Sequence, residues 1–226
     1  MDCKWLSDEF SAICTNGECP ACGDACPALN YAEICRYAEN GSVWVQCEYY
    51  YQGDDRWRKV QFTSCGKPSQ TIGSSGAGPV AMAMVLATWV DKHITPVEMA
   101  KLAVDNGFRT MMCGTAWPFF KFVAEKYMFK KFVQTTRMDT LKEGLRQGAL
   151  AICSMSSGDG NFWTQGGTFV VVVGYGDGYI YAFDPCKRQH PRKQQEDKFK
   201  QCLKQAFIFW PFIQWDAKGG EPVGAR

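Results

Sequence analysis

The sequence lacks three features that would assign it quickly to a functional class. It has no apolar run of the length that crosses a bilayer, so we expect no contact with a membrane. Its formal net charge is only +2, so no overall field favours binding to nucleic acid. Only two of its 226 residues are histidines, His93 and His190. A histidine acting as a general base must therefore be one of these two.

The chain also lacks a recognisable export signal. Residues 1–5 are acidic and mixed, unlike the basic start and apolar core of a signal peptide. We therefore predict a cytoplasmic protein. In that reducing compartment, 12 cysteines are more compatible with metal ligation or burial than with disulfides. The length and the 46% of hydrophobic residues predict one sizeable core with a small appendage.

Cysteines are concentrated at the start of the chain. The dense part follows the pattern Cys-x4-Cys-x2-Cys-x3-Cys-x8-Cys, with prolines and glycines that disfavour regular structure. Such a segment buries little and needs a cross-link, which four thiolates around a structural zinc ion would provide. The candidate zinc ligands are Cys14, Cys19, Cys22, Cys26 and Cys35. Disulfides in an exported protein, or simply buried thiols, remain the alternatives.

A glycine-rich turn before an apolar helix is the central stretch of the sequence. Gly73 and Gly76 allow the turn, Pro79 suits a first helical position, and the apolar residues 80–90 follow at helical spacing. Position 77 therefore lies at a helix N-terminus, where free N–H groups and the dipole would lower the pKa of a thiol. The residue there is Ala77, which has no such chemistry.

The rest of the chain predicts helices first and strands afterwards. Thr95 to Glu98 form a capping box for a helix that ends near Gly107, and Gly114-Thr115 should cap a third helix over 116–127. Strands are expected at 43–47, 49–51, 131–134, 149–155, 169–173, 179–184 and 205–210, and further helices at 139–146 and 198–203. This order predicts an α+β domain.

Three stretches of this domain resemble the papain-like cysteine peptidases of family thirty-nine, in particular their stand-alone bacterial branch. They are Gln52-Gly53-Asp54-Asp55-Arg56-Trp57, Ile72-Gly73-Ser74-Ser75-Gly76-Ala77-Gly78-Pro79 and Gly166-Gly167-Thr168-Phe169-Val170-Val171. The family is related to domains that trim double-glycine leaders from bacteriocin precursors. The resemblance implies a papain-like fold, with N-terminal helices packed on a C-terminal antiparallel sheet, preceded here by the small Cys-rich segment.

The resemblance also implies the roles of single positions. Ala77 stands at the position of the nucleophilic cysteine and Thr168 at that of the catalytic histidine. Gln52 matches the glutamine that helps to form the oxyanion hole, and Asp184 matches the aspartate that orients the histidine. Without a nucleophile and a base, the retained pair cannot perform acyl transfer. Gly76 and Gly167 would allow a peptide to approach the backbone closely.

These substitutions predict an inactive, peptidase-like protein that binds a peptide or protein partner in the former active-site cleft. One alternative is a bacterial cysteine peptidase whose nucleophile has been replaced in this sequence, and another is a structural assembly component. A rebuilt pair of Cys186 and His190 is a third alternative. The basic loop 187–193 is expected to be solvated. We expect a Cys-rich segment at 1–40, the peptidase-type domain at 41–213 and a flexible tail at 214–226.

Overall fold

The computed structural model describes residues 42–111, 114–156, 162–163, 166–188 and 191–211. The Cys-rich segment at 1–40, with all five candidate zinc ligands, lies outside these residues. The predicted tail at 214–226 and His190 lie outside them as well. The zinc site and the three-part division of the chain therefore stay predictions.

The central helix, α4 (Ala77–Trp89), is buried on all sides. Its ten residues from Gly78 to Ala87 are inaccessible or nearly so, which explains why small and apolar residues follow one another without a polar face. The helix begins at Ala77, two residues before the start that Pro79 suggested. A one-turn helix, α3 (Ile72–Ser75), precedes it, and a capping box of Thr71 and Ser74 stabilises the N-terminus of α3.

Two further helices complete this layer. Helix α5 (Pro96–Asp105) starts at the predicted capping box, in which the Thr95 backbone N–H donates to the Glu98 carboxylate at 2.7 Å. It ends as predicted before Gly107, whose φ of +73° suits a helix C-terminus. Helix α6 (Pro118–Lys126) is shorter than expected. Among the helices that the structure describes, none has the length and apolar character needed to span a bilayer.

Seven strands of the described part of the chain form one antiparallel sheet with the order β4-β9-β5-β6-β7-β8, in which β1 also pairs with β6. Its strands are β1 (Val43–Trp44), β4 (Lys131–Thr135), β5 (Leu150–Met155), β6 (Thr168–Gly176), β7 (Tyr179–Phe183), β8 (Arg192–Gln195) and β9 (Leu203–Trp210). Strands β2 (Arg109–Thr110) and β3 (Gly114–Thr115) form a separate two-stranded sheet.

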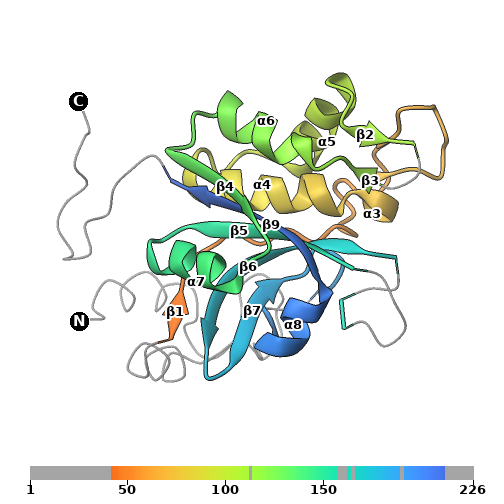
Figure 1. Cartoon of the computed structure of the whole chain (residues 1–226). Coiled ribbons are helices and arrows are strands. Elements are labelled where there is room, and N and C mark those ends of the chain that lie inside the picture. The colour runs from red at the N-terminus through yellow and green to blue at the C-terminus, as the bar shows by residue number, and fades with distance from the viewer. Residues whose placement is uncertain (1–41, 112–113, 157–161, 164–165, 189–190, 212–226) are drawn as a thin grey trace, which may run out of the picture.

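Both faces of the sheet are covered, so alternate residues of each central strand enter different cores. On β6, Val171 and Val173 pack with α4, α5 and α6, while Val170 and Val172 pack on the opposite side. That opposite side is covered by α7 (Met138–Arg146) and α8 (Glu196–Cys202), as Figure 1 shows. The predicted α+β architecture, with helices packed on an antiparallel sheet, is confirmed.

Three local predictions were wrong. Gly114-Thr115 is not a helix cap but strand β3, paired with β2 (Arg109–Thr110) around the buried Arg109 side chain. Residues 49–51 form no strand. The predicted loop at 187–193 contains the start of β8. This strand pairs with β7 through backbone hydrogen bonds, which could not be inferred from its charged side chains.

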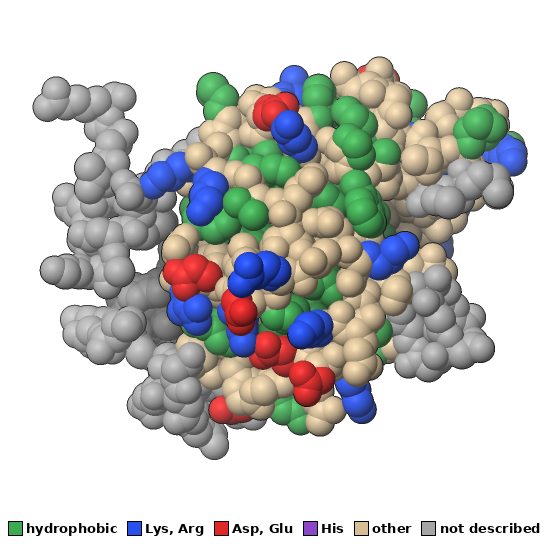
Figure 2. Space-filling view, in the orientation of Figure 1, with side chains coloured by type: hydrophobic (Ala, Val, Ile, Leu, Met, Phe, Trp, Pro, Cys, Tyr) green, Lys and Arg blue, Asp and Glu red, His purple; other side chains and the backbone are tan. Residues whose placement is uncertain are grey.

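The outer surface over α7 and α8 carries alternating charges of both signs (Figure 2). Lys142 pairs with Glu196 at 2.8 Å, which joins α7 to the first turn of α8. Arg146 pairs with Glu143 on α7, also at 2.8 Å. These are solvated faces of ordinary composition, and the predicted site residues lie elsewhere, at the end of the sheet next to α4.

Candidate functional site

Ala77 is the first residue of α4 and lies between two glycines that the packing requires. A side chain at Gly76 would place its Cβ 2.6 Å from the Ile72 carbonyl oxygen, and one at Gly78 would place it 2.5 Å from Thr115 Oγ1. Position 77 therefore lies in a tightly packed turn at the start of α4, and the predicted helix N-terminus at this position is found in the structure. The methyl group of Ala77 is half-buried and offers no proton, lone pair or nucleophile.

Gln52 connects the turn before α4 with the segment after β7. Its side chain is nearly buried, with 5% of the residue exposed. Its amide nitrogen Nε2 donates to the carbonyl oxygen of Gly73 at 2.9 Å, and its backbone N–H donates to the Pro185 carbonyl at 2.7 Å. Gln52 therefore lies between the stretch that contains Ala77 and the stretch that contains Asp184.

Thr168 is the first residue of β6 and faces Cys186. Its hydroxyl lies 3.6 Å from Cys186 Sγ and donates a long bond of 3.4 Å to the Phe169 carbonyl. A hydroxyl in this setting has no group that would take up its proton, because a thiol and an amide carbonyl are weak acceptors. Gly167, which precedes it, is exposed and has a φ of +80°, a conformation that favours glycine.

Asp184 is fully buried, and both of its carboxylate oxygens have partners. Oδ1 accepts from the Cys186 backbone N–H at 2.9 Å, and Oδ2 accepts from the Arg192 guanidinium at 2.9 Å. Burial of a carboxylate without such partners would be strongly unfavourable. The carboxylate is therefore committed to contacts within the protein.

Cys186, which the sequence suggested as part of a rebuilt pair with His190, lies at the centre of this group. Its thiol donates to Gln52 Oε1 at 3.2 Å and lies against the Thr168 hydroxyl. Burial raises the pKa of this thiol; the hydrogen bond with Thr168 opposes this increase, and the negative charge of Asp184 adds a smaller increase. The thiol is therefore protonated at neutral pH and is a poor nucleophile.

Arg192 is the residue that sequence reasoning missed. It sits on β8, paired with Ala182 of β7, and reaches past the end of β7 to Asp184. Its second nitrogen donates to the Phe162 carbonyl at 2.9 Å, and its guanidinium lies 3.8 Å above the Phe162 ring. The signal available in the sequence was Asp184 itself, because a buried aspartate that lacks a histidine partner needs another cation.

The structure thus brings Gln52, Thr168 and Asp184 together around one thiol. Ala77 is connected to them through Gly73, the residue four positions before it, which binds the Gln52 amide. Among the described residues, no group of three or more His, Cys, Asp or Glu side chains could hold a metal ion. The arrangement can bind and orient polar groups, but it contains no base beside a nucleophile.

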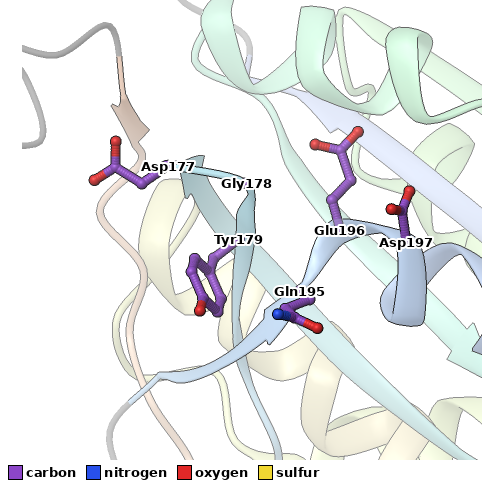
Figure 3. Close-up of a pocket in the computed structure, with 6 residues that line it drawn as sticks. All are labelled: Asp177, Gly178, Tyr179, Gln195, Glu196 and Asp197. Atoms are coloured by element: carbon purple, nitrogen blue, oxygen red, sulfur yellow. The ribbon is translucent and has the colours of Figure 1, made fainter.

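A separate depression of about 490 Å³ lies at the far end of β6 (Figure 3). It is lined by Asp177, Gly178, Tyr179, Gln195, Glu196 and Asp197. Thr168 begins β6 and Asp177 follows its last residue, so the strand, at roughly 3.3 Å per residue, separates the two regions. This depression is therefore not part of the group around Cys186.

Comparisons with known proteins bear on the family and the fold. The profile of the Peptidase_C39 like family matches residues 47–215, which is more than half of the chain. A C39-like peptidase structure from Bacillus anthracis is similar in fold, with 15% identity, a TM-score of 0.53, and coverage of 74% of this chain and 96% of that one. No curated protein matches the sequence.

Two weaker structural similarities involve peptidase domains of transporters. The peptidase domain of Streptococcus ComA has 17% identity and a TM-score of 0.47, over 61% of this chain and 93% of that one. A double-glycine-motif protease from an AMS/PCAT transporter, solved with its leader peptide, has 20% identity and a TM-score of 0.46, over 75% and 94%. Neither carries an argument here. From the profile match, the chain belongs to the Peptidase_C39 like family.

Proposed function

We propose that this protein is a catalytically inactive member of its family and binds a peptide or protein partner at the former active site. The observation that carries the proposal is the pair of substitutions at the chemical positions. Ala77 provides no nucleophile and Thr168 no base. Loss of one member of a catalytic group that acts as a unit already lowers the rate by a factor on the order of 10⁴ to 10⁶.

The neighbouring groups do not offer a replacement. Cys186 has its pKa raised by burial, so little thiolate forms at neutral pH. The Gln52 amide is held by Gly73 and Cys186, and both oxygens of Asp184 are bonded. These groups support a fixed polar surface rather than a proton-transfer chain.

Two exposed aromatic residues favour binding at this end of the molecule. Phe162, with 38% of its surface exposed, is stacked by Arg192 on the side of the sheet. Trp117, with 39% exposed, follows the β3 strand whose Thr115 touches the first turn of α4. Exposed aromatic side chains that are held rigidly are good anchors for a peptide. A bound extended peptide would also use the glycine backbone at Gly167.

Binding and turnover can be tested on the same sample. We expect extended peptides, including sequences that end in a double glycine, to shift the amide resonances of Gly76 and Gly167 and to remain uncleaved after prolonged incubation. The variant Phe162→Ala should weaken this response, whereas Met128→Ala, at an exposed position on the loop after α6, should leave it unchanged. A complete absence of response would favour an assembly component, and cleavage would refute inactivity.

A further inference from the structure

The buried carboxylate of Asp184 needs a positive partner, and among the described residues Arg192 is the cation that contacts it. No part of Asp184 is accessible, and its Oδ2 is 2.9 Å from the Arg192 guanidinium. Oδ1 is bonded to a backbone N–H, which is a dipole and not a charge. Burying a carboxylate in this way is strongly unfavourable unless a cation faces it.

Arg192 is held in place by contacts on three sides. One nitrogen binds Asp184, another donates to the Phe162 carbonyl, and the guanidinium plane lies on the Phe162 ring, with the Trp163 ring 5.3 Å away. Only 17% of its side chain is exposed. A planar guanidinium suits such a site, because it can stack and donate at once.

Thr168 lies close enough to Asp184 that a longer side chain at position 168 could bind the same carboxylate. It lies three residues before Val171, which pairs with Phe183, the neighbour of Asp184. Its hydroxyl touches Cys186, whose backbone N–H binds Asp184. A longer side chain at 168 would therefore point at the Asp184 region, where diagonal neighbours on antiparallel strands are roughly 7–8 Å apart.

We propose that Arg192 has replaced a histidine at position 168 as the cationic partner of Asp184, so that the guanidinium and an imidazole at 168 are alternative partners of one buried carboxylate. This inference rests on the proposed function in taking 168 as the former histidine position. Arg192 acts as a positioning residue: it keeps Asp184 buried and carries the Phe162 ring. The loss of the histidine is thereby compensated without loss of the fold.

A double-mutant cycle at 168 and 192 tests the proposal by thermal unfolding. Arg192→Gln should lower the unfolding midpoint by about 6 °C or more, because it leaves a buried carboxylate uncompensated. Adding Thr168→His should recover at least half of that loss at pH 6 and less at pH 8, since only the protonated imidazole replaces the charge. Adding Asp184→Asn should also recover part of it.

The control is Arg146→Gln, which breaks an exposed pair with Glu143 and should change the midpoint little at either pH. In the Thr168→His protein, the imidazole should titrate about one pH unit higher when Arg192→Gln is present, a shift that a purely structural role of Arg192 would not produce. If Arg192→Gln alone does not fold, folding of the double variant Thr168→His with Arg192→Gln at pH 6 becomes the readout, because the proposal expects the imidazole to restore the missing charge, and failure of that variant to fold would overturn the proposal.

Equal losses with and without Thr168→His at both pH values, together with an unshifted imidazole, would overturn the proposal. That result would leave the peptide-binding assay unaffected, so failure of the Arg192 inference and failure of the proposed function are distinguishable. Recovery of the unfolding midpoint by Asp184→Asn without any recovery by Thr168→His would also overturn the proposal. The ion pair would then be real, but position 168 would not be the alternative source of charge.

Discussion

The amide nitrogen of Gln52 donates a hydrogen bond of 2.9 Å to the carbonyl oxygen of Gly73. This contact joins the chain before the helical layer to the turn that starts α4. Because the Gln52 carbonyl simultaneously accepts from the Cys186 thiol, both ends of the amide are used within the protein. Gln52 is therefore a structural bridge at the candidate site, whatever else its second N–H can contact.

Replacement of this bridge should be costly. We expect Gln52→Ala to reduce the free energy of unfolding by about 1–3 kcal/mol, because it leaves a carbonyl and a thiol without their partner in a nearly buried place. Urea unfolding followed by circular dichroism measures the change. Gln61→Ala removes an exposed amide bonded to the Pro68 carbonyl and serves as the matched control, with an expected change under about 0.5 kcal/mol. Similar losses in the two variants would contradict the bridging role.

The glycine after Ala77 should resist substitution. In Gly78→Ala, the new Cβ would lie 2.5 Å from Thr115 Oγ1 and 2.7 Å from Thr115 Cβ, so α4 and β3 must move apart. Overpacking of this kind costs about 1–3 kcal/mol. The control is Gly166→Ala, since no atom lies within 4 Å of a Cβ there. If Thr115→Ala failed to relieve the effect of Gly78→Ala, the assigned contact would be wrong.

The central elements of the fold could be predicted because their signals are local. Capping at Thr95 and Glu98, the left-handed glycine at 107 and the apolar run of β6 each follow from short-range preferences. Alternation on β6 was hidden, because both faces are buried and its residues read as one continuous hydrophobic run. Such a run predicts a buried strand, but it does not show which helices cover each of its two faces.

The site was only partly predictable, for a different reason. The family resemblance indicated Gln52 and Asp184, but their actual partners depend on contacts between distant residues. Cys186 meets Gln52 across 134 positions, and Arg192 reaches Asp184 only because β8 pairs with β7. A basic loop gives no sign that one of its arginines is partly buried against an aspartate, so such partners follow from tertiary packing alone.

Thiol reactivity should distinguish two cysteines of the peptidase-type domain, Cys65 and Cys186. Burial raises the pKa of Cys186, whereas a hydrogen bond with the Thr63 hydroxyl, with help from Lys67, lowers the pKa of the exposed Cys65. At pH 7 we expect iodoacetamide to modify Cys65 at least about tenfold faster than Cys186, because the thiolate is the reacting form. Peptide mapping by mass spectrometry gives both rates.

The pH dependence of that labelling has a definite sign. The Cys186 rate should still rise with pH at values where Cys65 has levelled off, since its thiol ionises later. Thr63→Val should slow labelling of Cys65 and leave Cys186 unchanged. Faster labelling of Cys186 than of Cys65 in the folded protein would mean that the group around Gln52 is open to solvent and that burial is not the cause of its pKa.

The Cys-rich segment should bind one zinc ion. We expect elemental analysis of the purified full-length chain to give about one equivalent, through thiolates chosen from Cys14, Cys19, Cys22, Cys26 and Cys35. Release by a chelator should lower protection of this segment from proteolysis, because metal binding and folding are coupled in small sites. The control, Cys202→Ser on α8, should retain the metal. A full-length protein that is protected and metal-free would refute the site.

Reintroducing a cysteine and a histidine tests most directly whether positions 77, 168 and 184 lie close together. Ala77→Cys should give a thiol whose pKa is somewhat lowered at the start of α4 but which has no base nearby. Adding Thr168→His should accelerate its reaction with an electrophilic cysteine trap, yet modestly, because Arg192 still occupies the Asp184 carboxylate. Adding Arg192→Gln as well should free that carboxylate to hold the imidazole, and we expect trapping at least about tenfold faster than for Ala77→Cys alone.

The order of the three rates separates the explanations. Modification must be mapped to position 77, because 12 other cysteines are present. Peptide hydrolysis should stay undetectable even in the triple variant, since the Gln52 amide remains bonded to Gly73 and Cys186 and is not directed at a reacting carbonyl. A double variant as fast as the triple would show that Arg192 does not restrain Asp184. Identical rates in all three would show that positions 77, 168 and 184 do not meet, and that this end of the sheet is not a former active site.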